Sequence, residues 1–96
     1  MTTADAICRA IRSRHLLSFT YKGDERTVAP YILGLDAKGV PTLSGVQFAG
    51  GSGTGFRSYV VDEISALAVT EHRFFRNHPD YNPRDRLFAR ILCQVA

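Results

Sequence analysis

The sequence predicts an α+β domain in which a small five-stranded antiparallel β-barrel is flanked by an N-terminal and a C-terminal helix. Three observations predict it. Apolar residues repeat with a helical period near both ends, they alternate with a period of two in between, and turn residues divide that middle part into five short runs. A chain of 96 residues builds one hydrophobic core, so we expect a single domain over residues 1–96.

The first expected element is a helix over residues 3–14. Thr2 stands three positions before Asp5, which is the spacing of a capping box. Apolar residues then follow at helical spacing, so the helix is amphipathic. Its apolar stripe consists of Ala6, Ile7, Ala10 and Ile11, and its outer face carries Arg9, Arg12 and Ser13.

The alternating middle part indicates strands with one buried face. Pro30 falls inside the second strand, which must therefore lie at an edge or contain a bulge, because proline donates no ladder hydrogen bond. Asp62 and Glu63 leave room only for a tight turn before the last strand, which suggests a small rolled barrel of the Sm-like kind. The five expected strands cover about residues 17–22, 26–35, 40–48, 56–61 and 64–71.

A glycine-rich segment at residues 50–55 separates the third and fourth strands. It lacks the Gly-Lys-Ser/Thr ending of a phosphate-binding P-loop and precedes a strand instead of a helix. We therefore expect a mobile hairpin loop there.

A second helix is expected over residues 83–95. Asn82 is a favourable cap, Pro83 is favoured at the first helical position, and Asp85 suits the positive end of the helix dipole. The apolar stripe of this helix, which must cover the barrel or a neighbouring subunit, is Leu87, Phe88, Ile91, Leu92 and Val95.

Two blocks of the chain resemble the WYL domain of bacterial regulators, which is an Sm-like barrel. Residues 17–23 (LSFTYKG) and 26–30 (RTVAP) are similar to a family strand that ends in tyrosine and to its Arg-x-Val-x-Pro stretch. Residues 57–67 (RSYVVDEISAL) are similar to the family's Arg-x-Phe-Arg-Leu-Asp-Arg-Ile segment. The name-giving Trp-Tyr-Leu falls at residues 41–43, where only Leu43 matches.

The resemblance implies a ligand-sensing role, with nucleotides or nucleic-acid ends as ligands and transcription as the output. It transfers four site residues to this chain, namely Tyr21, Arg26, Arg57 and Tyr59. Arg57 and Tyr59 lie two apart on one strand, hence on one face, where a guanidinium could clamp a phosphate while a ring stacks on a base. The competing interpretation is that both arginines pair with acidic residues on the barrel rim, among Asp24, Glu25, Asp62 and Glu63.

The rest of the sequence predicts neither an enzyme nor a metal or cofactor site. Ser44, Ser52 and Ser58 have no nearby histidine and acid arranged for catalysis. His72 and His78 flank a basic and aromatic segment, which is either a nucleic-acid contact or a packed bridge, but two histidines are too few for a zinc site. The arginines of the last helix, Arg84, Arg86 and Arg90, are expected on its solvated face.

Composition predicts a cytoplasmic protein with an anionic partner. No apolar run reaches the roughly 18 residues of a membrane span, and the N-terminus lacks the layout of a signal peptide. Cys8 and Cys93 are expected to be reduced and buried, because disulfides are rare in the cytosol. The net charge is +3, and ten of the twelve cationic residues are arginine, whose planar fork suits phosphate and carboxylate.

Two functions therefore remain open. The first is a non-catalytic binding module that takes a nucleotide or single-stranded nucleic acid and regulates transcription or a partner protein. The second is a homodimeric assembly domain without a small ligand, which associates through the apolar stripe of the C-terminal helix.

Overall fold

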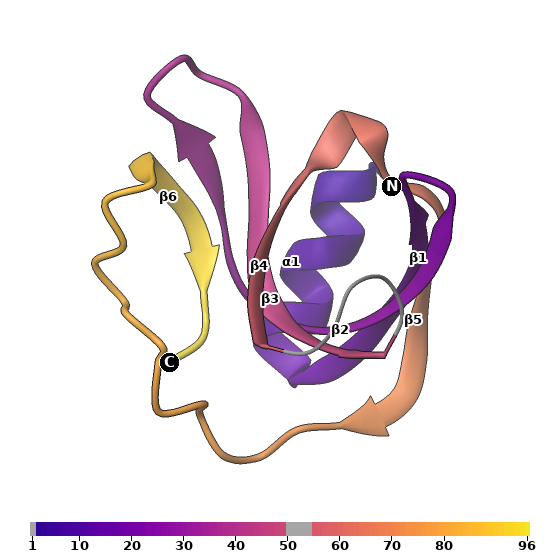
Figure 1. The fold of residues 1–96 in the computed structure, drawn as a ribbon. Helices are drawn as coiled ribbons and strands as arrows, with labels where there is room; N and C mark the ends of the chain where they lie inside the picture. Colours follow the sequence, from indigo (N-terminus) through magenta and orange to yellow (C-terminus); the bar gives the residue numbers. More distant parts are fainter. Residues whose placement is uncertain (1, 50–54) are drawn as a thin grey trace.

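A single helix and one curved antiparallel sheet make up the protein (Figure 1), whose computed structural model describes residues 2–49 and 55–96. The helix α1 (Thr3–Ser13) comes first. The strands that follow are β1 (His15–Tyr21), β2 (Asp24–Asp36), β3 (Pro41–Ala49), β4 (Gly55–Val60), β5 (Ser65–Arg73) and β6 (Phe88–Gln94), with a short 3-10 turn η1 (Val61–Glu63) between β4 and β5.

α1 begins where the sequence predicts and ends at Ser13, one residue before the predicted end. The Thr2 hydroxyl accepts a hydrogen bond of 3.1 Å from the Asp5 backbone N–H, and the Asp5 carboxylate accepts one of 3.2 Å from the Thr2 backbone N–H. These two bonds also lower the pKa of Asp5. At the other end, Arg14 takes the left-handed conformation (φ 58°), which stops the helix and turns the chain into β1.

β2 is the central strand of the sheet and pairs with other strands along both of its edges. The strand order is β4-β3-β2-β1-β5, and β6 also pairs with β2. The first part of β2 pairs with β1 up to Val28, and its second part pairs with β6 from Ile32 onward. Pro30 lies in the gap between these two ladders, and the pairing with β3 shifts register between Pro30 and Ile32, so the predicted irregularity is confirmed.

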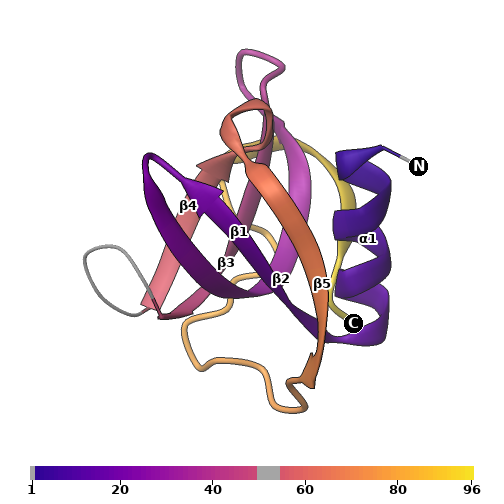
Figure 2. The ribbon, with the colours of Figure 1, turned by 90° about the vertical axis from the view of Figure 1, so that its right-hand side faces the viewer.

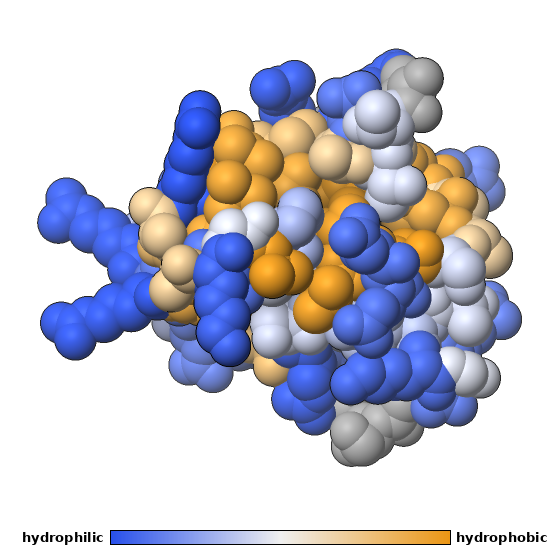
Figure 3. All heavy atoms as spheres, turned by 90° about the horizontal axis from the view of Figure 1, so that it is seen from above, coloured by the Kyte–Doolittle hydropathy of each residue, from blue (hydrophilic) through white to orange (hydrophobic). Residues whose placement is uncertain are grey.

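The expected closed five-stranded barrel is wrong, because the sheet is open and has six strands. β4 and β5 end the strand order and, within the described residues, no ladder joins them. The short connection between β4 and β5 led to the prediction of a closed barrel. The η1 turn joins these two strands along the chain, but a short connection does not require their backbones to pair. Figure 3 shows apolar residues exposed across the end of the molecule where η1 and the start of α1 lie.

The expected C-terminal helix over residues 83–95 is also wrong, because β6 occupies most of that stretch. The polar residues that favour a helix start instead close local turns. The Asn82 side chain accepts from the Arg84 backbone N–H (3.0 Å), and the Asp85 carboxylate accepts from that of Leu87 (2.9 Å). After these turns, residues 88–94 pair with the second half of β2. This backbone pairing with a distant strand overrides the helical period of the apolar residues.

A disulfide between Cys8 and Cys93 fastens β6 to α1, so the expected pair of reduced thiols is wrong as well. The two Cα atoms lie 5.9 Å apart although 85 positions separate them in the sequence. The sequence separation hid this pairing, because it depends on β6 returning along β2 to the helix.

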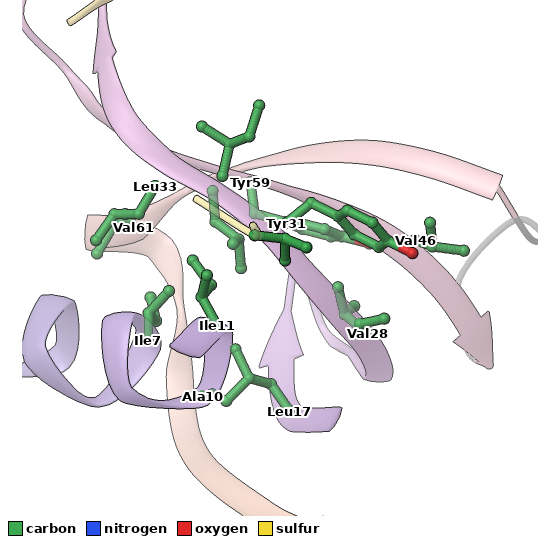
Figure 4. Packing of buried hydrophobic residues seen from close by; sticks show 14 of the residues in the cluster. Ile7, Ala10, Ile11, Leu17, Val28, Tyr31, Leu33, Val46, Tyr59 and Val61 are labelled. Atoms are coloured by element: carbon green, nitrogen blue, oxygen red, sulfur yellow. The ribbon is translucent and has the colours of Figure 1, made fainter. Parts of the chain in front are cut away.

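The core lies between α1 and the concave side of the sheet. Ile7, Ala10 and Ile11 point from α1 toward the strands (Figure 4), and each is at most 1% exposed. β2 is buried on both sides, since the ring of Tyr31 packs against Phe74 and other aromatic rings from the segment that leads to β6. The site residues on β1, β2 and β4 are therefore held by a packed frame.

Candidate functional site

Three aromatic rings on β1 and β4 form the wall of the candidate site. The rings of Phe19, Tyr21 and Tyr59 meet edge to face, and the centroid of Tyr59 lies 5.1 Å from each of the other two. Tyr59 is 1% exposed and Tyr21 6% exposed. The Tyr21 hydroxyl accepts a hydrogen bond of 2.9 Å from the backbone N–H of Val60, which ties β1 to β4 across the interior.

A buried amide joins these rings to the first arginine. The Oε1 atom of Gln47 accepts from the Tyr59 hydroxyl (2.8 Å) and from Nη1 of Arg26 (3.1 Å). Nη2 of Arg26 donates to the backbone carbonyl of Tyr21 (3.1 Å) and lies 3.8 Å from the exposed Asp24 carboxylate. The network therefore holds Arg26 with its guanidinium 5.6 Å from the Tyr21 ring centroid.

One polar atom of this network has no partner. The Nε–H group of Arg26 is buried and donates to no acceptor among the described residues, although the side chain as a whole is 12% exposed. A buried donor without an acceptor is costly, and such a group in a folded protein calls for a structural or functional explanation.

The second arginine reaches the same phenol through its charge. Burial raises the pKa of Tyr59, and the positive charges of Arg26 and Arg57 oppose that rise. Both guanidinium groups thus act on one phenol oxygen. Nη1 of Arg57 also donates to the backbone carbonyl of Phe56 (3.1 Å).

Arg57 also lines a hollow of about 320 Å³. The Ser44 and Ser58 positions, which pair across β3 and β4, form part of its wall. Asp80 and Asp85 face it from the segment that leads to β6. The hollow therefore combines one cation with two carboxylates and two hydroxyls, and its other lining residues are Ile32, Phe56, Tyr81, Asn82 and Leu87.

Of the four residues chosen from the sequence, Tyr21, Arg26 and Tyr59 lie together, and Arg57 stands two positions before Tyr59 on β4. The structure brings Tyr21, Arg26 and Tyr59 into contact, and Arg57 joins them by its charge on Tyr59. The two tyrosine rings are enclosed, so neither offers a face on which a base could stack. Of the acidic partners considered for the arginines, Asp24 contacts Arg26.

Sequence reasoning missed Gln47, which is fully buried and holds the network together. Its signal was available: a long amide stands inside a strand whose neighbours Val46 and Phe48 are apolar. A polar side chain in such a run needs buried partners, and Arg26 and Tyr59 supply them.

The other candidate segments behave differently from one another. The residues 50–54 of the expected mobile hairpin lie outside the described part of the chain. His78 packs edge-on against the Phe56 ring (5.4 Å), so it belongs to a packed bridge, whereas Phe75 is 74% exposed with the Arg73 guanidinium 5.3 Å from its centroid. Arg84, Arg86 and Arg90 are exposed, but on a turn region and β6 and not on a helix.

Within residues 2–49 and 55–96, no set of three or more histidine, cysteine or acidic side chains is grouped so as to hold a metal ion. In the same residues, no helix has the length and apolar character that crossing a bilayer requires. Comparisons of the chain with models of protein families, with curated proteins and with solved structures give no match.

Proposed function

We propose that this chain is a non-catalytic module that binds a nucleotide or single-stranded nucleic acid through a phosphate held by Arg26 and Arg57. The observation that carries the proposal is the unpaired buried donor Nε of Arg26, beside a phenol on which both guanidinium groups act. Guanidinium groups bind phosphate oxygens with short, charge-assisted hydrogen bonds. The resemblance of residues 17–30 and 57–67 to the WYL domain supports the same class of ligand.

The enclosed tyrosines favour one mode of binding within this proposal. Tyr21 and Tyr59 shape the cluster, but they do not stack on a base, because their rings are covered. The phosphate therefore enters as the recognised group.

The hollow beside Arg57 favours a single nucleotide over a long strand. Asp80 and Asp85 accept hydrogen bonds from sugar hydroxyls, as carboxylates do in many nucleotide sites, but they repel further phosphates. A ligand with one sugar and one phosphate group matches this hollow, because the phosphate can bind the arginine and the sugar hydroxyls can bind the carboxylates. Binding then alters a partner protein, which is the sensing part of the proposal.

The test is calorimetric titration of the chain at low salt with inorganic phosphate, a nucleoside monophosphate and a short oligothymidylate. We expect the monophosphate to bind, with affinity falling as salt rises. Arg57→Gln should weaken binding at least tenfold. Arg26→Lys should also weaken it at least tenfold, although the side chain keeps its positive charge, because lysine lacks the planar guanidinium fork. Arg12→Gln, which removes an exposed arginine of α1 that belongs neither to the network nor to the lining of the hollow, is the matched control.

Two results would overturn the proposal. One is an absence of heat and of chemical-shift change with all three probes at millimolar concentration. The other is binding that Arg57→Gln and Arg12→Gln weaken equally, since this would show attraction by net charge alone.

The alternative of a homodimer through a C-terminal helix is not carried forward, because residues 88–94 form β6. The cytoplasmic location belongs to the proposal and is testable through the disulfide. Cytosolic reductants keep most thiols reduced, so thiol labelling of the protein in intact cells should find Cys8 and Cys93 free if it resides there.

A further inference from the structure

A groove of about 670 Å³ lies between α1 and β5, away from the proposed anion site. Figure 2 shows these two elements next to each other. The groove has an apolar floor and a positive rim, and its lining includes no acidic residue. The lining residues are Ala6, Arg9, Ala10, Arg12, Ser13, His15 and Val69.

Val69 is the main apolar contribution of β5 to this floor. Its side chain is 46% exposed, which leaves a large aliphatic surface facing solvent between two arginine-bearing turns of the helix. Exposed aliphatic surface that borders charged residues is typical of a protein-binding surface.

β5 is also an edge of the sheet. Among the described residues β5 pairs with β1 only, so the backbone N–H and C=O groups on its other edge form no ladder with another strand. The ladder with β1 is regular at Ala68 and Val69 and shifts register on both sides of that pair. The edge around this regular pair, about residues 67–70, is therefore open to one short additional strand.

We propose that the α1–β5 groove binds an extended acidic peptide segment of a partner protein, which adds as a strand along residues 67–70. In an added strand, alternate side chains face the groove. An apolar side chain then covers Val69 and Ala6, and an acidic side chain two positions away reaches Arg12. The partner sequence should therefore read acidic-x-apolar-x-acidic.

Charge and surface chemistry select this occupant. The rim contributes two arginines and one histidine, which favour carboxylates and disfavour a basic segment. The groove lining has no aromatic ring on which a nucleic-acid base would stack. A peptide uses the apolar floor, the positive rim and the free backbone edge together.

The test uses the full chain and a fluorescein-labelled heptapeptide in which glutamate, valine and glutamate alternate with threonine or serine. We expect saturable binding by fluorescence anisotropy, with backbone amide shifts confined to residues 6–15 and 67–70 in NMR spectra. Val69→Asp and Arg12→Glu should each weaken binding at least tenfold. Arg86→Glu changes the net charge by the same amount as Arg12→Glu but lies outside the groove, so it should change affinity less than twofold.

Two variant peptides separate strand addition from simple attraction. A peptide with lysine at both acidic positions should not bind, and one with proline on each side of the valine should lose binding because it cannot donate to the β5 edge. Equal affinity for the proline peptide overturns the proposal, and so does binding that Arg12→Glu and Arg86→Glu weaken equally. Amide shifts at residues 67–70 that instead follow protein concentration or an added oligonucleotide assign the groove to a second copy or to nucleic acid and also overturn it.

Discussion

The hydroxyl of Tyr59 donates a 2.8 Å hydrogen bond to the side-chain carbonyl of Gln47, and neither residue is more than 1% exposed. The amide is shared, because Arg26 donates to the same oxygen. The Gln47 oxygen on β3 thus connects Tyr59 on β4 to Arg26 on β2 inside the protein.

Removing the Tyr59 hydroxyl should destabilise the fold. Tyr59→Phe keeps the ring packing but deletes one donor to the buried Gln47 oxygen, so we expect a loss of about 1–3 kcal/mol in the free energy of unfolding. Urea denaturation followed by circular dichroism measures it. In a double-mutant cycle with Gln47→Met, the second change should cost less after the first, and strictly additive losses would contradict a shared network.

The stability of the protein should fall in alkaline solution because of Tyr59. Burial raises the pKa of this phenol above its ordinary value of about 10. The folded chain therefore keeps a proton that the unfolded chain loses. Stability is fully present below pH about 10 and declines as pH rises toward the folded pKa.

Ultraviolet absorbance of tyrosinate measures this effect directly. A pH titration of the folded protein should show a late ionisation step from the Tyr59 phenol, and Tyr59→Phe should remove that late step. An unchanged titration curve in this variant would show that the late step belongs to another tyrosine.

Reducing the Cys8–Cys93 disulfide should lower stability by about 4–5 kcal/mol, because the bond closes a loop of 85 residues in the unfolded chain. Urea denaturation with and without dithiothreitol measures the difference. The Cys8→Ser, Cys93→Ser double variant should match the reduced protein and should not respond to dithiothreitol. Two free thiols in the untreated protein would contradict the bond.

A methyl group at Gly34 should displace β6. A Cβ there would meet the Arg90 backbone oxygen and, at 2.7 Å, the Phe88 ring, and backbone atoms cannot rotate away. We expect Gly34→Ala to cost about 1–3 kcal/mol and to speed hydrogen exchange in residues 88–94. Ala89→Val, which enlarges an exposed residue of β6, is the control and should leave that exchange slow.

The sequence predicts the parts of this fold that local chemistry decides. The α1 start at Thr2 follows from a capping box, and the first five strands follow from alternation and turns, each within about two residues of its predicted bounds. The same rules fail at residues 83–95. There Asn82 and Asp85 close turns, and the free edge of β2 decides for a strand, which no local pattern encodes.

The candidate site divides in the same way. A pattern of residue types singles out Arg26 and Tyr59, and the structure joins them through the side-chain oxygen of Gln47. The pattern does not reveal that the tyrosine rings are enclosed, because that depends on tertiary contacts of Tyr59 with Phe19 on β1 and with Gln47 on β3. The α1–β5 groove is likewise tertiary, since its two walls lie more than 50 positions apart in the sequence.

The Cys8–Cys93 bond also determines how the molecule responds to mechanical pulling. Force applied at the two chain ends passes directly from residue 8 to residue 93 through sulfur and bypasses the whole sheet. Under oxidising conditions the domain should therefore hardly lengthen, whereas chemical reduction should release roughly 300 Å of contour from the 85-residue loop. In an optical trap, the oxidation state of Cys8 and Cys93 should therefore determine how far the domain can be extended.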